Sequence, residues 1–193
     1  MWKIFFKQEE ITGMSVKERC KRGIGYIPSD RYKRAILPGF SLKDNYLLGN
    51  QYKDSYARKG MLNQEYIEKK TKELMEKFDV RAVNGDQLIG ALSGGNQQKL
   101  VLSREVDKDP DLILACQPVR GLDIGAIKFI HNVLLELRNQ GKAVLLISAE
   151  LSDLFQLSDR IGVLYKGEMM SLQETEKYTT ESISLLMAGK KGV

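Results

Sequence analysis

Leu112-Ile113-Leu114-Ala115-Cys116 is a continuous apolar run, and it decides the fold class of this chain. A short run of this kind is typical of a strand that is buried on both faces of a sheet. A second run of this kind predicts a buried strand at 143–147, and a third strand is predicted at 161–165, with helices predicted over 124–139 and 150–157 between them. This alternation predicts right-handed crossovers and a parallel sheet, and therefore an α/β fold.

Upstream of this run the pattern is less regular. Residues 2–6 favour a strand, 16–22 a short helix, and 24–28 a buried strand that ends at a proline. An amphipathic helix is predicted from Tyr66 to Phe78. Its apolar stripe is expected to consist of Ile67, Leu74, Met75 and Phe78.

Composition excludes several classes of protein. The chain has 193 residues, of which 42% are hydrophobic and 28% charged, as in an ordinary soluble domain. No apolar run approaches the ~20 residues of a membrane-spanning helix. Cys20 and Cys116 lie far apart in sequence without metal-ligand spacing, and two cysteines form no disulfide framework. The net charge is +5, but the basic residues alternate with acidic ones, so we expect no nucleic-acid partner.

Residues 92–99 carry the clearest chemical signal, and they read Leu-Ser-Gly-Gly-Asn-Gln-Gln-Lys. Ser93 suits the N-cap of a helix that is predicted to reach about Val106. The two glycines allow the backbone to approach an anion, and the helix N-terminus adds positive dipole character. Ser-Gly-Gly alone more often marks a glycine-rich turn before an ordinary helix, so the longer string has to support the phosphate-binding interpretation.

That longer string resembles the signature motif of ABC ATPases, in the form found in sugar and nucleoside importers. Other segments resemble the family's motifs in the same order: Gly23–Arg31 the Q-loop region, Asp111–Pro118 the strand before the D-loop, and Arg120–Ala126 the D-loop. Ser148–Glu150 and Ser158–Ile161 follow in family order. The resemblance covers almost the whole chain, and it fits best the second, C-terminal cassette of the tandem-cassette importers.

The resemblance implies a P-loop NTPase-like (ABC ATPase) α/β fold with a parallel sheet and an inserted helical subdomain, incomplete at the N-terminus. The helical subdomain is expected at about 40–108, a RecA-like core portion at about 109–172 and a C-terminal tail at 173–193. A P-loop (Walker A) needs Gly-x-x-x-x-Gly-Lys-[Ser/Thr]. Neither Gly141-Lys142 nor Gly189-Lys190 has that context. We therefore expect a truncated product or one piece of a longer protein.

Four positions depart from what the resemblance implies for catalysis. Cys116 stands at the family's magnesium-binding Asp and Gln117 at its water-polarising Glu, while Ala149 replaces the switch histidine and Ser29 the Q-loop glutamine. A thiol is a poor ligand for Mg²⁺, and an amide cannot take a proton at neutral pH. No catalytic position is intact, and the chain alone is expected to be hydrolytically inactive. His131, the only histidine, is interpreted as a surface or packing residue.

Cassettes of this family work as head-to-tail pairs, which implies a role in trans. Ser93, Gly94, Gly95 and Gln97 would contact the nucleotide held by a second ABC cassette of the same or a tandem polypeptide. The D-loop residues Gly121, Leu122 and Asp123 would align that interface. ATP and Mg²⁺ are expected in the assembled transporter, with neither held tightly by this chain alone and no metal site of its own.

The same resemblance implies a transmembrane permease as partner, a substrate-binding protein as an indirect one, and a peripheral location on the cytoplasmic face of the membrane. The sequence Ala-Cys-Gln-Pro favours nucleosides over sugars. Two alternatives stay open: a non-catalytic interaction or regulatory cassette, and a soluble ABC protein not linked to transport. Arg31 and Arg34 are interpreted as solvated surface residues, and Arg104 as a packing residue.

Overall fold

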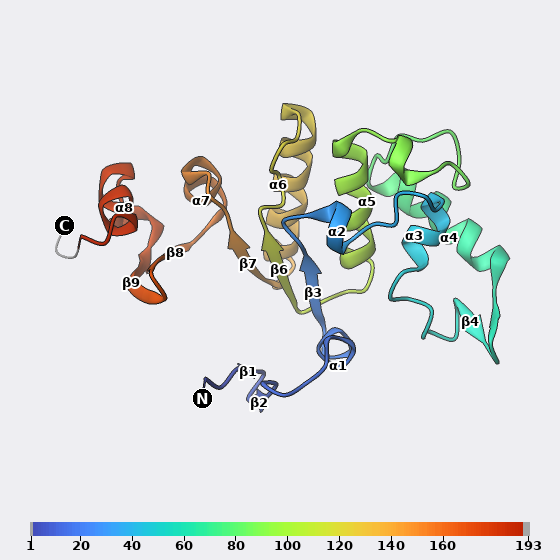
Figure 1. Ribbon diagram of the computed structural model, residues 1–193, viewed down its shortest axis with the longest axis horizontal. Helices are drawn as coiled ribbons and strands as arrows, with labels where there is room; N and C mark the ends of the chain where they lie inside the picture. Colours follow the sequence, from blue (N-terminus) through green and yellow to red (C-terminus); the bar gives the residue numbers. More distant parts are fainter. Residues whose placement is uncertain (1, 191–193) are drawn as a thin grey trace. The chain divides into compact units, whose positions relative to one another are not determined.

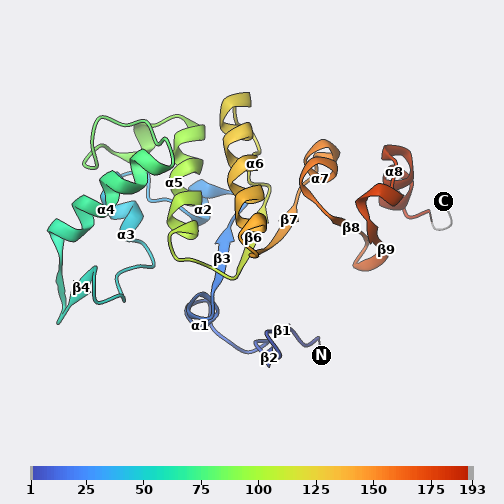
Figure 2. The same cartoon turned by 180° about the vertical axis from the view of Figure 1, so that it is seen from behind.

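The computed structural model describes residues 2–190, which fall into two compact units divided between Leu145 and Leu146. Figures 1 and 2 show their elements from opposite sides. The expected helical subdomain, 40–108, lies within the first unit, and its status as a subdomain stays a prediction. In residues 2–190, no helix combines the length and the apolar character that crossing a bilayer requires.

A three-stranded sheet organises the first unit. It has the order β3-β6-β7, with β3 at Ile24–Ile27, β6 at Leu112–Cys116 and β7 at Ala143–Ile147. Strands β3 and β6 are parallel, and their register aligns Ile27 with Ala115. The predicted parallel arrangement is therefore confirmed for this pair.

Strand β7 corrects one expectation. It was predicted to be buried on both faces, but Leu145 is 54% exposed and Ile147 is 52% exposed. Burial alternates along the strand, so the described residues cover only one of its faces. An apolar run indicates that a strand can be buried, but it does not determine whether other elements pack on one face or on both.

Two helices stand side by side next to the sheet, α5 at Gly94–Val106 and α6 at Ile124–Asn139 (Figures 1 and 2). α5 is the central element of the core, because it contacts β3, α6, α3 and α4. Leu100, Val101 and Leu102 on α5 are almost completely buried. Both helices begin at the residues that the sequence predicts.

The other helices of this unit are short, apart from α4 at Gln64–Lys77, which confirms the predicted amphipathic helix. Ile67, Leu74 and Phe78 are buried as expected, whereas Met75 is only partly buried. The remaining helices are α1 at Val16–Lys21, α2 at Arg31–Arg34, α3 at Leu42–Leu47 and the 3₁₀ turn η1 at Ile89–Ala91.

The first unit contains two small hairpins. The strand predicted over 2–6 is limited to β1 at Phe5–Phe6, which pairs with β2 at Glu9–Glu10. Lys7 and Gln8 between them have φ of 48° and 66°, a conformation that turns the chain back at once. A second hairpin joins β4 at Ala57–Arg58 to β5 at Met61–Leu62.

The second unit contains α7 at Leu151–Leu157, β8 at Arg160–Tyr165, β9 at Glu168–Glu174, η2 at Thr175–Lys177 and α8 at Thr180–Met187. β8 was expected in the parallel sheet, but it pairs antiparallel with β9. Lys166 and Gly167 have φ of 46° and 84°, and a two-residue turn of this hand joins antiparallel strands. Ile161, Val163, Tyr178, Ile183 and Leu186 form the core of this unit. Residues 191–193 of the expected C-terminal tail lie outside the described residues.

Candidate functional site at the start of helix α5

The N-terminus of α5 forms the centre of the candidate site. Ser93 is its N-cap, and its hydroxyl accepts a hydrogen bond from the backbone N–H of Asn96 at 3.4 Å. Gly94 and Gly95 follow as the first helical residues, so their N–H groups have no acceptor within the helix. The predicted cap is confirmed, and two backbone donors point outward from the helix end.

The two glycines are needed for different reasons. A Cβ on Gly95 would lie 2.9 Å from Cβ of Ala126 and 3.1 Å from Oδ2 of Asp123, so Gly95 allows the start of α6 to approach α5. A Cβ on Gly94 would lie 2.6 Å from Nη2 of Arg31 and 3.7 Å from Cδ2 of Leu122. The fold therefore brings the expected signature glycines beside the expected D-loop, which is distant in sequence.

The D-loop segment is shaped by a glycine and a cap. Gly121 has φ of 70°, a left-handed conformation that glycine adopts without strain. Asp123 is the N-cap of α6, and its Oδ1 accepts a hydrogen bond from the N–H of Ala126 at 2.9 Å. Backbone donors at the helix start, first that of Ala126, hold the pKa of the Asp123 carboxyl below its ordinary value. Asp123 is thus a fixed negative charge beside Gly95.

Gln97 differs from the other residues of the motif because it is 0% exposed. Its Nε2 donates to the hydroxyl of Tyr32 at 2.9 Å and approaches the carbonyl oxygens of Leu92 and Ile89 at 3.1 and 3.2 Å. Its Oε1 accepts a hydrogen bond from Nε of Arg31 at 3.1 Å. Gln97 was expected to contact nucleotide, but here its whole amide is used inside the chain, where it holds α2 against α5.

This contact corrects the interpretation of Arg31. It is half-buried and bonded to the signature helix, not a solvated surface residue. Arg34, three residues later on α2, is exposed as expected. No pattern in the sequence distinguishes the two arginines, because the contact with Gln97 joins segments 66 residues apart.

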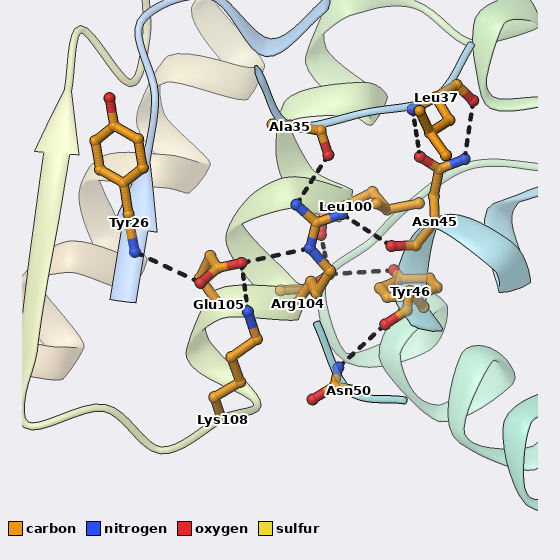
Figure 3. Close-up of polar contacts among 11 residues, drawn as sticks. Tyr26, Ala35, Leu37, Asn45, Tyr46, Asn50, Leu100, Arg104, Glu105 and Lys108 are labelled. Carbon is orange, nitrogen blue, oxygen red and sulfur yellow. Dashed lines mark hydrogen bonds and ion pairs between the residues drawn. The ribbon is translucent and has the colours of Figure 1, made fainter. Parts of the chain in front are cut away.

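The C-terminal half of α5 is bonded to residues 35–45, the segment that follows α2 (Figure 3). Arg104 is 6% exposed, and it donates from Nη1 to the carbonyl of Asn45 at 2.8 Å and from Nη2 to that of Ala35 at 2.9 Å. Burial lowers the pKa of its guanidinium. The side chain of Asn45 in turn accepts from the N–H of Leu37 at 2.8 Å and donates to its carbonyl at 3.1 Å. The prediction that Arg104 supports packing is confirmed.

Glu105 extends this network to the sheet (Figure 3). Its Oε2 accepts from the backbone N–H of Tyr26 on β3 at 3.5 Å, and its Oε1 pairs with Lys108 at 2.7 Å. The hydroxyl of Ser103 lies 3.2 Å from that of Tyr46, whose pKa is raised by burial. Both ends of α5 are therefore tied to residues 26–46, so the two segments form one connected body.

The four degenerate positions lie at or just after the ends of strands and not on α5. The register of β3 and β6 places their carboxyl ends at one edge, where Cys116 is the last residue of β6 and Ser29 follows β3. Gln117 has φ of 48°, and Ala149 is an exposed residue of the second unit. A thiol is a poor ligand for Mg²⁺ and a neutral amide cannot take a proton, and no cluster of three or more metal-ligand side chains occurs within residues 2–190. His131 is 6% exposed on α6, which confirms a packing position.

Several known proteins are similar to this chain in sequence, although no protein-family model matches it. It is 42% identical over 181 residues to the guanosine import ATP-binding protein NupO of Bacillus subtilis, and 38% identical over 181 residues to the nucleoside import ATP-binding protein NupA of Lactococcus lactis. Both alignments cover 94% of this chain but 36% of the relative. The chain thus spans little more than a third of the length of these relatives.

Solved structures show the same fold. A dimeric post-hydrolysis state of the ATP-binding cassette MJ0796, bound to ADP and Pi, matches 91% of this chain and 74% of that one, with a TM-score of 0.73 and 22% identity. Another dimeric structure of this bacterial ABC transporter cassette gives a TM-score of 0.72. The chain therefore has the α/β fold of ABC ATP-binding cassettes, and it is similar in sequence to ATP-binding proteins of nucleoside and sugar import.

Proposed function

We propose that this chain is part of the nucleotide-binding subunit of an ABC importer for simple sugars or nucleosides, from its second, C-terminal cassette. In that role it presents the signature motif and the D-loop to a nucleotide held by a partner cassette. The chain's similarity to import ATP-binding proteins supports the transport assignment. The names of two relatives, guanosine and nucleoside import, agree with the preference for nucleosides that Ala-Cys-Gln-Pro suggests.

One observation carries the proposal. The outward-pointing N–H groups of Gly94 and Gly95 lie directly beside the D-loop residues Leu122 and Asp123. A helix N-terminus with free backbone donors suits a phosphate group. The carboxyl of Asp123 beside it is negatively charged and would repel a phosphate, so Asp123 is better suited to a contact with a second protein surface.

Catalysis is proposed to depend on the partner. Cys116 and Gln117 offer neither a good Mg²⁺ ligand nor a general base at the end of β6. A P-loop supplied by a partner cassette would hold ATP and Mg²⁺, and this chain would close over the phosphates. By itself the chain is expected to hydrolyse ATP very slowly.

A permease contact is proposed near the Q-loop segment, on the cytoplasmic face of the membrane. Leu37, Phe40 and Leu88 are 41%, 53% and 52% exposed. The N–H of Ile89 donates to the carbonyl of Phe40 at 3.1 Å, so these apolar side chains belong to neighbouring segments. Large exposed apolar side chains that gather in one place favour a protein partner.

Calorimetric titration with MgATP tests the proposal. The chain alone should give no saturable heat at millimolar nucleotide. Adding the intact cassette of the same transporter should produce tighter binding than that cassette shows alone. The variant Ser93→Ala should weaken this gain, whereas Arg34→Gln on the exposed side of α2 should leave it unchanged. Saturable binding by the chain alone, or no gain in the mixture, would overturn the proposed half-site.

A further inference from the structure

We infer that Arg31 is a phosphate-binding residue of the same site, and that it contacts the terminal phosphates of the nucleoside triphosphate that the signature motif meets. This inference rests on the proposed function and adds a side-chain cation to a site otherwise made of backbone donors. It assigns a role to a residue that lies far from the signature motif in sequence.

Position is the first argument. Nη2 of Arg31 lies 2.6 Å from the place where a Cβ on Gly94 would be, so the guanidinium rests directly on the first glycine of the motif. Gly94 is helical, and its lack of a side chain leaves the space that the guanidinium occupies. Any anion that reaches the N–H groups of Gly94 and Gly95 would therefore also meet Arg31.

Orientation is the second argument. Nε of Arg31 is held by Oε1 of the fully buried Gln97 at 3.1 Å. Gln97 is itself fixed by Tyr32, so its acceptor oxygen cannot turn away without losing that bond. Among residues 2–190 the structure shows no acceptor for the two Nη groups of Arg31. A guanidinium held at Nε with both Nη groups available is pre-organised for the two parallel hydrogen bonds that Arg makes to phosphate.

Charge is the third argument. A cation at the N-terminus of a helix is unfavourable, because that end carries a partial positive charge. Within the described part of the chain no carboxylate forms an ion pair with Arg31. Asp30, the preceding residue, caps α2, and Asp123 beside Gly95 caps α6. An anion between Arg31 and the glycine N–H groups would relieve this repulsion.

A neighbouring cation of the motif cannot take this role. Lys99 is 8% exposed and pairs with Oδ2 of Asp79 at 2.6 Å, so its charge is neutralised within the chain. Arg34 is exposed on α2 without a contact to the motif, which makes it a matched control for Arg31.

The experiment uses the complete transporter that contains this chain, reconstituted with its permease, and measures ATP hydrolysis against ATP concentration. Arg31→Gln should raise KM for ATP about tenfold to one-hundredfold, as expected for losing charge-assisted hydrogen bonds. Arg31→Lys should recover part of the loss, because it restores the charge without the planar fork. Arg34→Gln should change KM by less than about twofold.

Two results would overturn the inference. One is that Arg31→Gln has the same KM for ATP as the control variant Arg34→Gln. The other is that Arg31→Gln lowers the melting temperature and kcat but leaves KM for ATP unchanged, which would show that Arg31 only supports the fold. Ser93→Ala separates the inference from the function on which it rests. If Ser93→Ala weakens ATP dependence and Arg31→Gln does not, only the inference fails; if neither variant has an effect, the proposed function fails as well.

Discussion

The two glycines that begin α5 should respond differently to the same substitution. In Gly95→Ala the new Cβ would lie 2.9 Å from Cβ of Ala126 and 3.1 Å from Asp123 Oδ2, both held at the start of α6. Neither neighbour is the end of a long side chain, so the helices have to separate, and overpacking of this kind costs about 1–3 kcal/mol. The better helix propensity of alanine returns up to about 1 kcal/mol. The net expected loss is about 1–2 kcal/mol.

In Gly94→Ala the close atom is Nη2 of Arg31, the end of a long side chain that can move away only by giving up its hydrogen bond to Gln97. The lost hydrogen bond costs about 1 kcal/mol and the helix propensity of alanine returns up to about 1 kcal/mol, so we expect a change in the free energy of unfolding close to zero. The assay is urea unfolding of both variants and the parent chain, followed by far-UV circular dichroism. With a slope of about 2 kcal/mol per M, Gly95→Ala should lower the midpoint by roughly 0.5–1 M. A Gly95→Ala variant as stable as Gly94→Ala would refute the assignment of Gly95 to close helix packing.

Two further predictions concern stability. Arg104→Met should cost about 3–5 kcal/mol in urea unfolding, because it leaves the buried carbonyl groups of Ala35 and Asn45 without their donor and removes one of the two cations beside the Glu105 carboxylate. A cost no larger than the ±0.5 kcal/mol expected of Arg34→Gln would contradict this. The hydrogen bond from Lys99 lowers the pKa of Asp79, so this carboxylate should add stability that is present above its unfolded pKa of about 4 and lost as pH falls through its lower folded pKa. Since Asp79 is about half exposed, Asp79→Asn should cost only about 0.5 kcal/mol of unfolding free energy at pH 7. Unfolding curves measured between pH 2 and 7 should show that this difference between the variant and the parent chain disappears in acid. A difference that persists at pH 2 would exclude the ion pair as its cause.

Local features of this chain were accessible from sequence. Helix α5 begins where Ser93 predicts, because an N-cap acts through hydrogen bonds to residues two or three positions later, and α6 spans the predicted residues 124–139. The strand at Leu112–Cys116 was predicted from its apolar run, and the parallel pairing from the order of elements. The fold of an ABC cassette followed from these signals and from the motif string at 92–99.

The pairing of the strands and the burial of their faces were less accessible from sequence. β8 was expected in the parallel sheet, because a strand's own pattern does not indicate which strand it pairs with. The burial of β7 was overestimated for a related reason. Leu145 and Ile147 are apolar, but their burial depends on what packs on each face, and that is not a local property.

By itself, the sequence determined which residues begin the helices, where the apolar strands run and which string is available for phosphate contact, because these depend on neighbours along the chain. Only the tertiary structure decided that Gln97 is buried, that Gly95 is a packing glycine and that Arg31 rests on Gly94. These roles arise from contacts between segments far apart in sequence. Such contacts depend on how helices and strands pack, and no periodicity or spacing in the chain encodes them directly.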